Sequence, residues 1–157
     1  MNLILWRHAE AEDGTDDLAR RLTPRGQRQA AAMARWLEPR LPAGFVLLAS
    51  PAARSLQTAA ALAGATARVD ARIAPDRSVA DHLAAIDWPP GPSSQDTTVV
   101  LVGHQPTLGR LASLLLAGRE IGWSVKKGAA WWLATRERDA HAQAQLRLVI
   151  APEQLEP

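Results

Sequence analysis

The feature that most constrains the fold is a short apolar run near the N-terminus that ends in an arginine–histidine pair. Leu3 to Trp6 are apolar, and Arg7 and His8 follow directly. A run of this length is typical of a buried strand, so the pair is expected at that strand's carboxyl end. In open α/β sheets ligands bind at this edge, although two polar residues that simply face water would give the same pattern.

The pair has a plain chemical use. Arginine offers a rigid fork of donors that fits phosphate, and a neutral histidine offers a ring nitrogen that can carry a phosphoryl group. The weight of this hypothesis depends on whether later strands end in the same kind of residue.

A second strand-to-helix unit repeats the design. Phe45–Ala49 is expected to be a strand, Ser50–Pro51 a cap and first turn, and the following helix is expected to end at Gly64. This places Arg54 in the first helical turn, where free amides and the helix dipole favour an anion. A surface arginine on a helix is the alternative reading of Arg54 alone.

A third unit is the clearest of all. Thr97–Val102 is expected to be a strand, Gly103 allows a tight backbone bend, and Pro106 opens a helix that stops at Gly118. His104 therefore lies at a third joint between a strand and a helix.

The remaining pattern completes an α/β domain that we expect to span residues 1–157. Thr23 and Pro24 predict the start of a helix that Pro39 ends. The other expected elements are a short strand at 67–69, a helix around residue 82, a loop at 88–95, strands at 129–134 and 146–150, and a polar loop at 137–145. The predicted fold is a three-layer α/β/α sandwich with a mainly parallel central sheet and at least one antiparallel C-terminal strand.

Composition excludes several classes of function. Eighteen basic residues against 16 acidic ones leave a formal charge of only +2, and no basic run predicts nucleic-acid binding. No segment approaches the ~20 apolar residues of a membrane span or looks like an export signal, so we expect a cytoplasmic protein. The chain has no cysteine, and Lys126 and Lys127 are its only lysines.

The three joints would bring two guanidinium groups and two imidazole rings to one edge of the sheet. This set, Arg7, His8, Arg54 and His104, suits a phosphate dianion, which needs several charged hydrogen-bond donors. A metal site is the competing interpretation, but two arginines beside two histidines would repel a cation. We therefore expect no metal.

These residues carry a resemblance to the histidine phosphatase superfamily, also called the phosphoglycerate-mutase-like family. The matching motifs run in the family's order over about two thirds of the chain: Arg7-His8-Ala9, Leu22-Thr23 with Gly26, Ala49-Ser50-Pro51 with Arg54 and Gln57-Thr58-Ala59, and Val102-Gly103-His104. The family signature has glycine where this chain has Ala9. The short length most resembles the SixA-type phosphohistidine phosphatases.

The resemblance implies a mechanism without metal or organic cofactor. His8 would be the nucleophile that forms a transient phosphohistidine. Arg7, Arg54 and His104 would form the phosphate pocket, and Thr23 would help to bind substrate. Many members also use an acidic residue from a later segment to protonate the leaving group, for which Asp76 is the best-placed residue here.

Asp76 has an equal alternative interpretation as a cap before Ser78, and Asp81 is a second candidate for the acid. We assign no role to Glu10 or Glu12. Arg20, Arg21, Arg25 and Arg28 form a basic rim or, for most of them, a solvated surface. His82 and His141 are expected at the surface or as capping residues, and Trp131 and Trp132 on opposite faces of the sheet.

Three hypotheses about function follow. The first is a SixA-like phosphatase that removes phosphate from phosphohistidine on a protein, as in the damping of a histidine–aspartate phosphorelay. The second is a phosphomonoesterase for a small metabolite such as a sugar or nucleotide phosphate. The third is a phosphate-binding regulatory module without catalysis. The sequence gives no indication of the oligomeric state.

Overall fold

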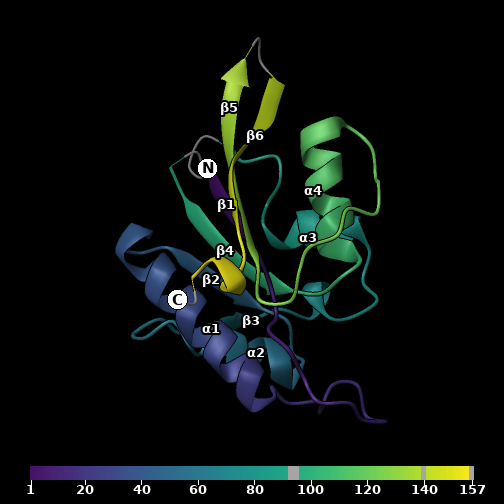
Figure 1. Ribbon diagram of the computed structural model, residues 1–157. Helices are drawn as coiled ribbons and strands as arrows, with labels where there is room; N and C mark the ends of the chain where they lie inside the picture. The colour runs from purple at the N-terminus through teal and green to yellow at the C-terminus, as the bar shows by residue number, and fades with distance from the viewer. Residues whose placement is uncertain (92–95, 139–140, 156–157) are drawn as a thin grey trace.

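A six-stranded sheet forms the centre of the computed structural model, which describes residues 1–91, 96–138 and 141–155 (Figure 1). The strand order is β3-β2-β4-β1-β5-β6. The strands are β1 (Asn2–Arg7), β2 (Val46–Ala49), β3 (Arg68–Val69), β4 (Thr98–Gly103), β5 (Ala130–Arg138) and β6 (His141–Ile150). The first four are mutually parallel, and β5 runs antiparallel to both of its neighbours. The predicted sheet is therefore confirmed.

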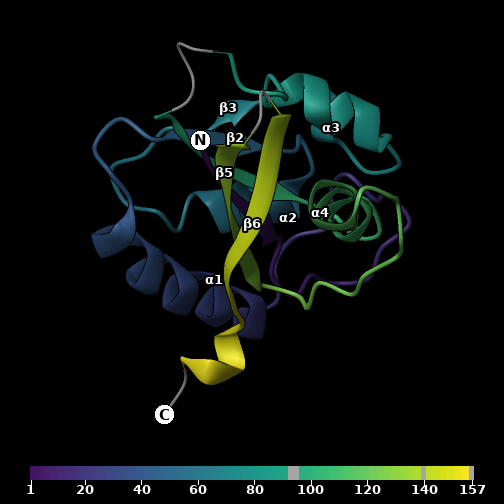
Figure 2. The same cartoon turned by 90° about the horizontal axis from the view of Figure 1, so that it is seen from above.

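Helices cover both faces of the sheet (Figure 2). α1 (Pro24–Leu37) and α2 (Ala53–Ala59) pack on one face, and α3 (Val79–Ala85) and α4 (Thr107–Ala117) pack on the other. Alternation along β1 explains both cores, because Ile4 and Trp6 face α1 while Leu3 and Leu5 face α4. All four side chains are buried, as expected of a strand in the middle layer of a three-layer sandwich.

The order of the strands brings the two histidines together. The chain leaves β1, forms β2 two positions away, and later inserts β4 between them. Arg7 and Gly103 are register partners at the ends of β1 and β4, and the His8 amide donates to the Gly103 carbonyl at 3.0 Å. His8 and His104 therefore leave adjacent parallel strands at a topological switch point, where ligands bind in such folds.

The helix ends predicted from capping residues are found in α1 and α4 but not in α2. Thr23 Oγ1 accepts from the Gly26 amide at 2.9 Å and caps α1, and Gly118 ends α4 with φ 73°. α2 begins at Ala53, later than the predicted cap at Ser50, and it ends at Ala59, well before Gly64. Ser50 Oγ accepts from the Ala52 amide at 3.3 Å and lies 2.7 Å from His104 Nε2, so it bonds ahead of the helix and Ala52 is the N-cap.

The C-terminal hairpin is longer than predicted. The polar stretch expected as a loop at 137–145 mostly pairs as strand, from Thr135 with Ala144 to Arg138 with His141, because backbone pairing needs no apolar side chains. Trp132 is buried on the α1 side and Trp131 packs on the opposite face, as predicted. Residues 139–140 and part of the expected 88–95 loop, 92–95, lie outside the described residues. No helix among the described residues has the length and apolarity needed to cross a membrane.

Candidate active site

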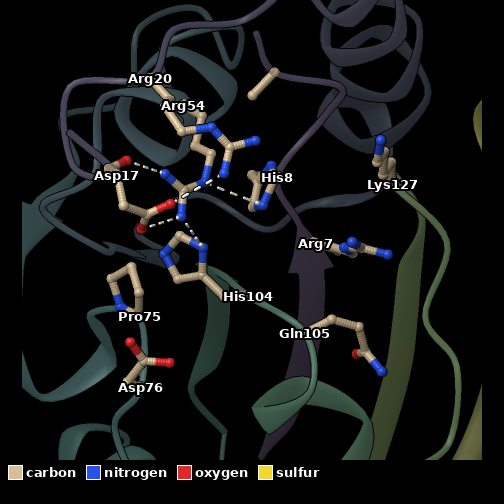
Figure 3. Close-up of a pocket in the computed structure, with 11 residues that line it drawn as sticks. Arg7, His8, Asp17, Arg20, Arg54, Pro75, Asp76, His104, Gln105 and Lys127 are labelled. Carbon is tan, nitrogen blue, oxygen red and sulfur yellow. Dashed lines mark hydrogen bonds and ion pairs between the residues drawn. The ribbon is translucent and has the colours of Figure 1, made fainter. Parts of the chain in front are cut away.

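A cavity of about 290 Å³ lies at the carboxyl edge of the parallel strands (Figure 3). It is lined by Arg7, His8, Arg54 and His104, the four residues expected at the joints between strands and helices. Asp76 also lines it. The other lining residues are Ala11, Asp17, Arg20, Pro75, Gln105 and Lys127. The size suits a phosphoryl group with a small neighbouring moiety, since it lies at the low end of ligand pockets.

His8 is held as a neutral ring with one unprotonated nitrogen. Its Nδ1 lies 2.7 Å from the Ala9 carbonyl, which can only accept, so Nδ1 carries the proton. Nε2 is then an unprotonated nitrogen that accepts from Arg54 Nε at 3.3 Å. Burial, helped by the nearby Arg54 and Arg7 charges, lowers the pKa of His8 to about 4. His8 therefore presents a nucleophilic nitrogen at neutral pH.

His104 is neutral in the opposite tautomer. Arg54 Nη2 can only donate and lies 3.3 Å from His104 Nδ1, so Nδ1 accepts. Nε2 therefore carries the proton and donates to Ser50 Oγ at 2.7 Å. Burial and the nearby His8 and Arg54 lower the pKa of His104 to about 3. The two imidazole rings lie with their centroids 5.1 Å apart.

Arg54 connects both histidines to an acidic residue that the sequence did not single out. Its Nη2 lies 3.0 Å from Asp17 Oδ2, and its Nη1 donates to the Asp17 carbonyl. Asp17 also accepts from Arg20 Nη1 at 3.0 Å. The hydrogen bond from Arg54 is the main reason that the pKa of Asp17 lies below its usual range. Arg54 is itself buried, so its charge acts in a poorly screened environment.

One nitrogen of the Arg7 guanidinium group is hydrogen-bonded within the protein, and another has no partner among the described residues. Its Nη1 donates to the Val125 carbonyl at 2.7 Å, while its buried Nε has no hydrogen-bond partner among the described residues. Burial lowers the pKa of Arg7. Because buried donors are nearly always satisfied, this unpaired N–H is an exception among the described residues.

Two residues of the Gln57-Thr58-Ala59 motif hold the site together. Thr58 Oγ1 donates to the Arg54 carbonyl at 2.7 Å and accepts from the Ala9 amide at 3.1 Å, so it ties the second arginine to the His8 loop. Gln57 Oε1 accepts from the Leu22 amide at 2.7 Å. The methyl group of Ala9, which replaces the family's glycine, is fully buried in a small apolar cluster with Leu22.

Several predicted residues lie outside the cavity lining. The Thr23 hydroxyl is engaged by the Gly26 amide and by Glu10, to whose Oε1 it donates at 3.0 Å, so the structure places Thr23 in a helix cap. Glu10 also pairs with Arg25 at 3.3 Å and is turned away from the cavity. His82 is fully buried, with Nδ1 2.9 Å from the Ser78 carbonyl, so its expected surface position is wrong. The His141 side chain lies outside the described residues.

Asp76 lines the cavity, next to Pro75 (Figure 3). Its φ of 64° is unusual for a residue other than glycine. The cap that Asp76 could have supplied to α3 comes from Ser78, whose hydroxyl accepts from the Asp81 amide in a capping box. Asp81 is used in that box and does not line the cavity. Asp76 therefore does not cap α3, and it is the one of the two candidate acids that lines the cavity.

Sequence reasoning missed three polar residues of the cavity and only partly anticipated Arg20. Asp17, Gln105 and Lys127 received no role, although the rarity of lysine in the chain was a usable signal for Lys127. Gln105 has a structural task, because its Nε2 donates to the Trp123 carbonyl at 2.6 Å and its Oε1 accepts from the Gly109 amide at 3.1 Å. In the part of the chain that the structure describes, no group of three or more histidine and carboxylate side chains could hold a metal.

Comparison with known proteins agrees with this geometry. A sequence model of the histidine phosphatase superfamily (branch 1) matches residues 3–76. The structure of a candidate phosphohistidine phosphatase SixA from Nakamurella multipartitia is 34% identical, covers 96% of this chain and 95% of that chain, and superposes with a TM-score of 0.77.

Two further solved structures share the fold at lower identity. The protein histidine phosphatase SixA in complex with tungstate is 23% identical, with coverage of 99% and 100% and a TM-score of 0.77. A mycobacterial glucosyl-3-phosphoglycerate phosphatase is 20% identical, with coverage of 94% and 97% and a TM-score of 0.70. The chain belongs to the histidine phosphatase superfamily, as the 34% identity to the Nakamurella structure over nearly its full length shows, in agreement with the match to the family model and the His8–Arg54–His104 geometry.

Proposed function

We propose that the protein is a cofactor-independent phosphatase that removes phosphate from phosphohistidine on a partner protein, through a covalent phosphohistidine at His8. The observation that carries the proposal is the neutral His8, whose unprotonated Nε2 faces a cavity lined by Arg7, Arg20 and Arg54. A nucleophile surrounded by guanidinium donors fits a phosphoryl dianion and few other groups.

In the first step the Nε2 lone pair forms a bond to phosphorus as the bond from phosphorus to the leaving nitrogen breaks. The leaving imidazole takes up a proton from solvent and departs as a neutral ring. The phosphorylated His8 ring gains positive charge, which the Ala9 carbonyl stabilises because it accepts from Nδ1–H. Arg7 and Arg54 bind the phosphoryl oxygens as the transition state forms.

In the second step water attacks the phosphorus of phosphorylated His8, the bond to Nε2 breaks, and inorganic phosphate leaves. The proton lost by water passes to the phosphate or to solvent. His104 Nδ1 lies beside Arg54 in the cavity. A phosphoryl dianion bound there would stabilise the protonated form of His104, and its Nδ1–H would become an additional donor. The resting enzyme is then restored.

The proposed substrate class rests on the exposure of the cavity rim at Lys127 and on likeness to SixA proteins. Lys127 at the rim is exposed, and the cavity has room for a phosphoryl group with a small neighbouring moiety. The second candidate is a small-molecule phosphomonoesterase, which one observation favours. Asp76 lines the cavity, and an alkoxide leaving group needs an acid of this kind, whereas imidazole leaves more easily.

The proposal is tested by phosphate release in the presence of a chelator, from a phosphohistidine-bearing protein and from a panel of phosphate monoesters. Wild type is compared with His8→Ala and with His8→Asn, which keeps a donor for the Ala9 carbonyl. Rapid quenching with radiolabelled substrate should show an acid-labile, alkali-stable label on wild type only.

Release confined to the phosphohistidine protein and lost in both His8 variants is the expected result. Faster turnover of a monoester would move the protein to the small-molecule class. Phosphate binding without release from any substrate would overturn catalysis and indicate a regulatory binding module.

A further inference from the structure

The turn that precedes β5 wraps around the end of β1 and carries a cation to the cavity. Its Gly128 amide donates to the His8 carbonyl at 3.1 Å, and its Gly128 carbonyl accepts from Trp6 Nε1 at 3.0 Å. The Val125 carbonyl, two residues before Lys127, accepts from Arg7 at 2.7 Å. The backbone on both sides of Lys127 is thus fixed to the strand that supplies the nucleophile.

Lys127 lies on the wall opposite Asp17, with His8 between them (Figure 3). The three arginines that share the cavity all have protein acceptors. Arg7 donates to a carbonyl, and Arg20 and Arg54 both donate to Asp17. The exposed Lys127 ammonium has no hydrogen bond or ion pair within the described residues.

A cation without a partner beside other cations is unfavourable in the free protein, because like charges repel. A ligand that brings its own negative charge relieves this repulsion. Arg7, Arg20 and Arg54 offer donors for a phosphoryl dianion at His8, so Lys127, which lies on the far side of His8 from Arg20 and Arg54, is left for a different part of the substrate. A lysine ammonium on a long stem can reach an anion beyond the phosphoryl position.

The neighbouring Lys126 shows that this placement is specific. It faces a separate cavity with Trp131, Glu153 and Gln154, on the other side of the turn. Only Lys127 of the two lysines lines the site. Two adjacent side chains of the same chemistry therefore form a matched pair for experiment.

We infer that Lys127 is a specificity-determining residue that binds a carboxylate placed next to the phosphoryl group of the substrate. This inference rests on the proposed phosphatase function. The carboxylate belongs either to an acidic residue beside phosphohistidine in a protein or to a small phosphorylated acid. The recognition chemistry is the same for both, and substrates can separate them.

The test uses two substrate pairs in which one member carries a carboxylate and the other has a neutral group in its place. Phosphoglycolate is compared with 2-hydroxyethyl phosphate, and a phosphohistidine peptide with a neighbouring aspartate is compared with its asparagine counterpart. The variants are Lys127→Met, Lys127→Arg and the control Lys126→Met. Lys127→Met should lower kcat/KM for the acidic member of a pair about fivefold through KM, the size of a partly exposed ion pair.

The neutral member of each pair should change less than about twofold, Lys127→Arg should keep the preference, and Lys126→Met should behave as wild type. A preference seen only with peptides assigns the carboxylate to a protein, and one seen only with the small acids assigns it to a metabolite. Equal loss on both members of a pair, or no loss on either, overturns the inference.

Binding keeps this test separate from the proposed function. Titration of the same phosphorylated compounds into His8→Asn, with and without Lys127→Met, measures the preference without turnover. If wild type hydrolyses nothing but Lys127→Met still weakens binding of the acidic compound alone, the proposed function fails and the inference stands. If wild type is active and neither measurement depends on Lys127, only the inference fails.

Discussion

Asp17 Oδ2 lies 3.0 Å from Arg54 Nη2, so the free protein carries its own carboxylate on the arginine that we propose binds the phosphoryl group. Arg54 also faces both histidines. The pair has two effects, since the carboxylate orients the guanidinium group and also competes with an incoming anion.

Asp17→Asn should strengthen the binding of inorganic phosphate. The asparagine oxygen can still accept from Arg54, while one negative charge beside the anion is removed. Because the Asp17 side chain is 51% exposed, solvent screens the effect, and we expect a gain of about threefold to tenfold.

Competitive inhibition by phosphate at fixed ionic strength measures this gain. The control is Asp13→Asn, which removes a fully exposed carboxylate that lies 3.9 Å from Arg20. Weaker phosphate binding in Asp17→Asn would instead show that orientation of Arg54 dominates.

The stability of the fold should fall as the pH drops from about 6.5 to 4.5. The pKa values of His8 and His104 in the folded protein, about 4 and about 3, lie below the unfolded value of 6.5. In this window the unfolded chain therefore binds more protons than the folded one, and each histidine costs roughly 1.4 kcal/mol per pH unit. Carboxylates with lowered pKa values, such as Asp17 and Asp70, add their losses only nearer pH 4.

Urea unfolding at several pH values between 4.5 and 7 measures this slope. His8→Asn and His104→Asn should each reduce the slope of the unfolding free energy against pH by roughly 1.4 kcal/mol per pH unit, the contribution of one proton. An unchanged slope in both variants would mean that these histidines are not kept neutral by the fold.

Ser50→Ala should impair His104 without removing a charge. The variant deletes the oxygen that accepts from His104 Nε2 at 2.7 Å and leaves only Ser55 Oγ, at 3.4 Å, near that buried N–H. The free energy of unfolding should fall by about 1–3 kcal/mol, the cost of an unsatisfied buried group. Ser50→Thr, which keeps the oxygen, serves as the control. Chemical denaturation together with turnover tests this, and full activity in Ser50→Ala would show that the contact does not position His104.

The convergence of four site residues could be predicted because it depends on strand ends. Parallel strands place the residues after them at one edge, so His8 and His104 needed only the correct reading of two apolar runs. Arg54 followed from the same logic, although its helix starts at Ala53, later than predicted.

Asp17 and Lys127 could not be placed in this way, because both lie in irregular segments with no periodic pattern. Their positions depend on contacts between residues far apart in the chain, from Arg54 to the Asp17 carbonyl and from Gly128 to the His8 carbonyl. His82 failed for a different reason. On a short helix its Nδ1 bonds to a carbonyl one turn earlier, so one ring nitrogen is paired inside the core, while Nε2 is buried with no partner among the described residues.

Gly109→Ala should disturb the site from a distance. A Cβ atom at Gly109 would lie 1.8 Å from the Trp123 carbonyl oxygen, so α4 and the segment that leads to Val125 would have to move apart. That segment holds Arg7, and turnover should fall together with a loss of stability of about 1–3 kcal/mol. Gly122→Ala is the matched control, since nothing lies within 4 Å of its added Cβ. Unfolding and kinetics that match the wild type in Gly109→Ala would contradict this packing.

Asp76→Asn should separate the two candidate substrate classes. Asparagine tolerates the left-handed backbone at this position, so the change isolates the carboxyl group. If Asp76 protonates an alkoxide, kcat for alkyl phosphates should fall about 100-fold or more, whereas phosphohistidine and nitrophenyl phosphate, whose leaving groups depart more easily, should change little. Asp81→Asn, on a residue that caps α3 away from the cavity, should leave both rates unchanged. Equal slowing of every substrate by Asp76→Asn would show instead that Asp76 shapes the cavity and transfers no proton.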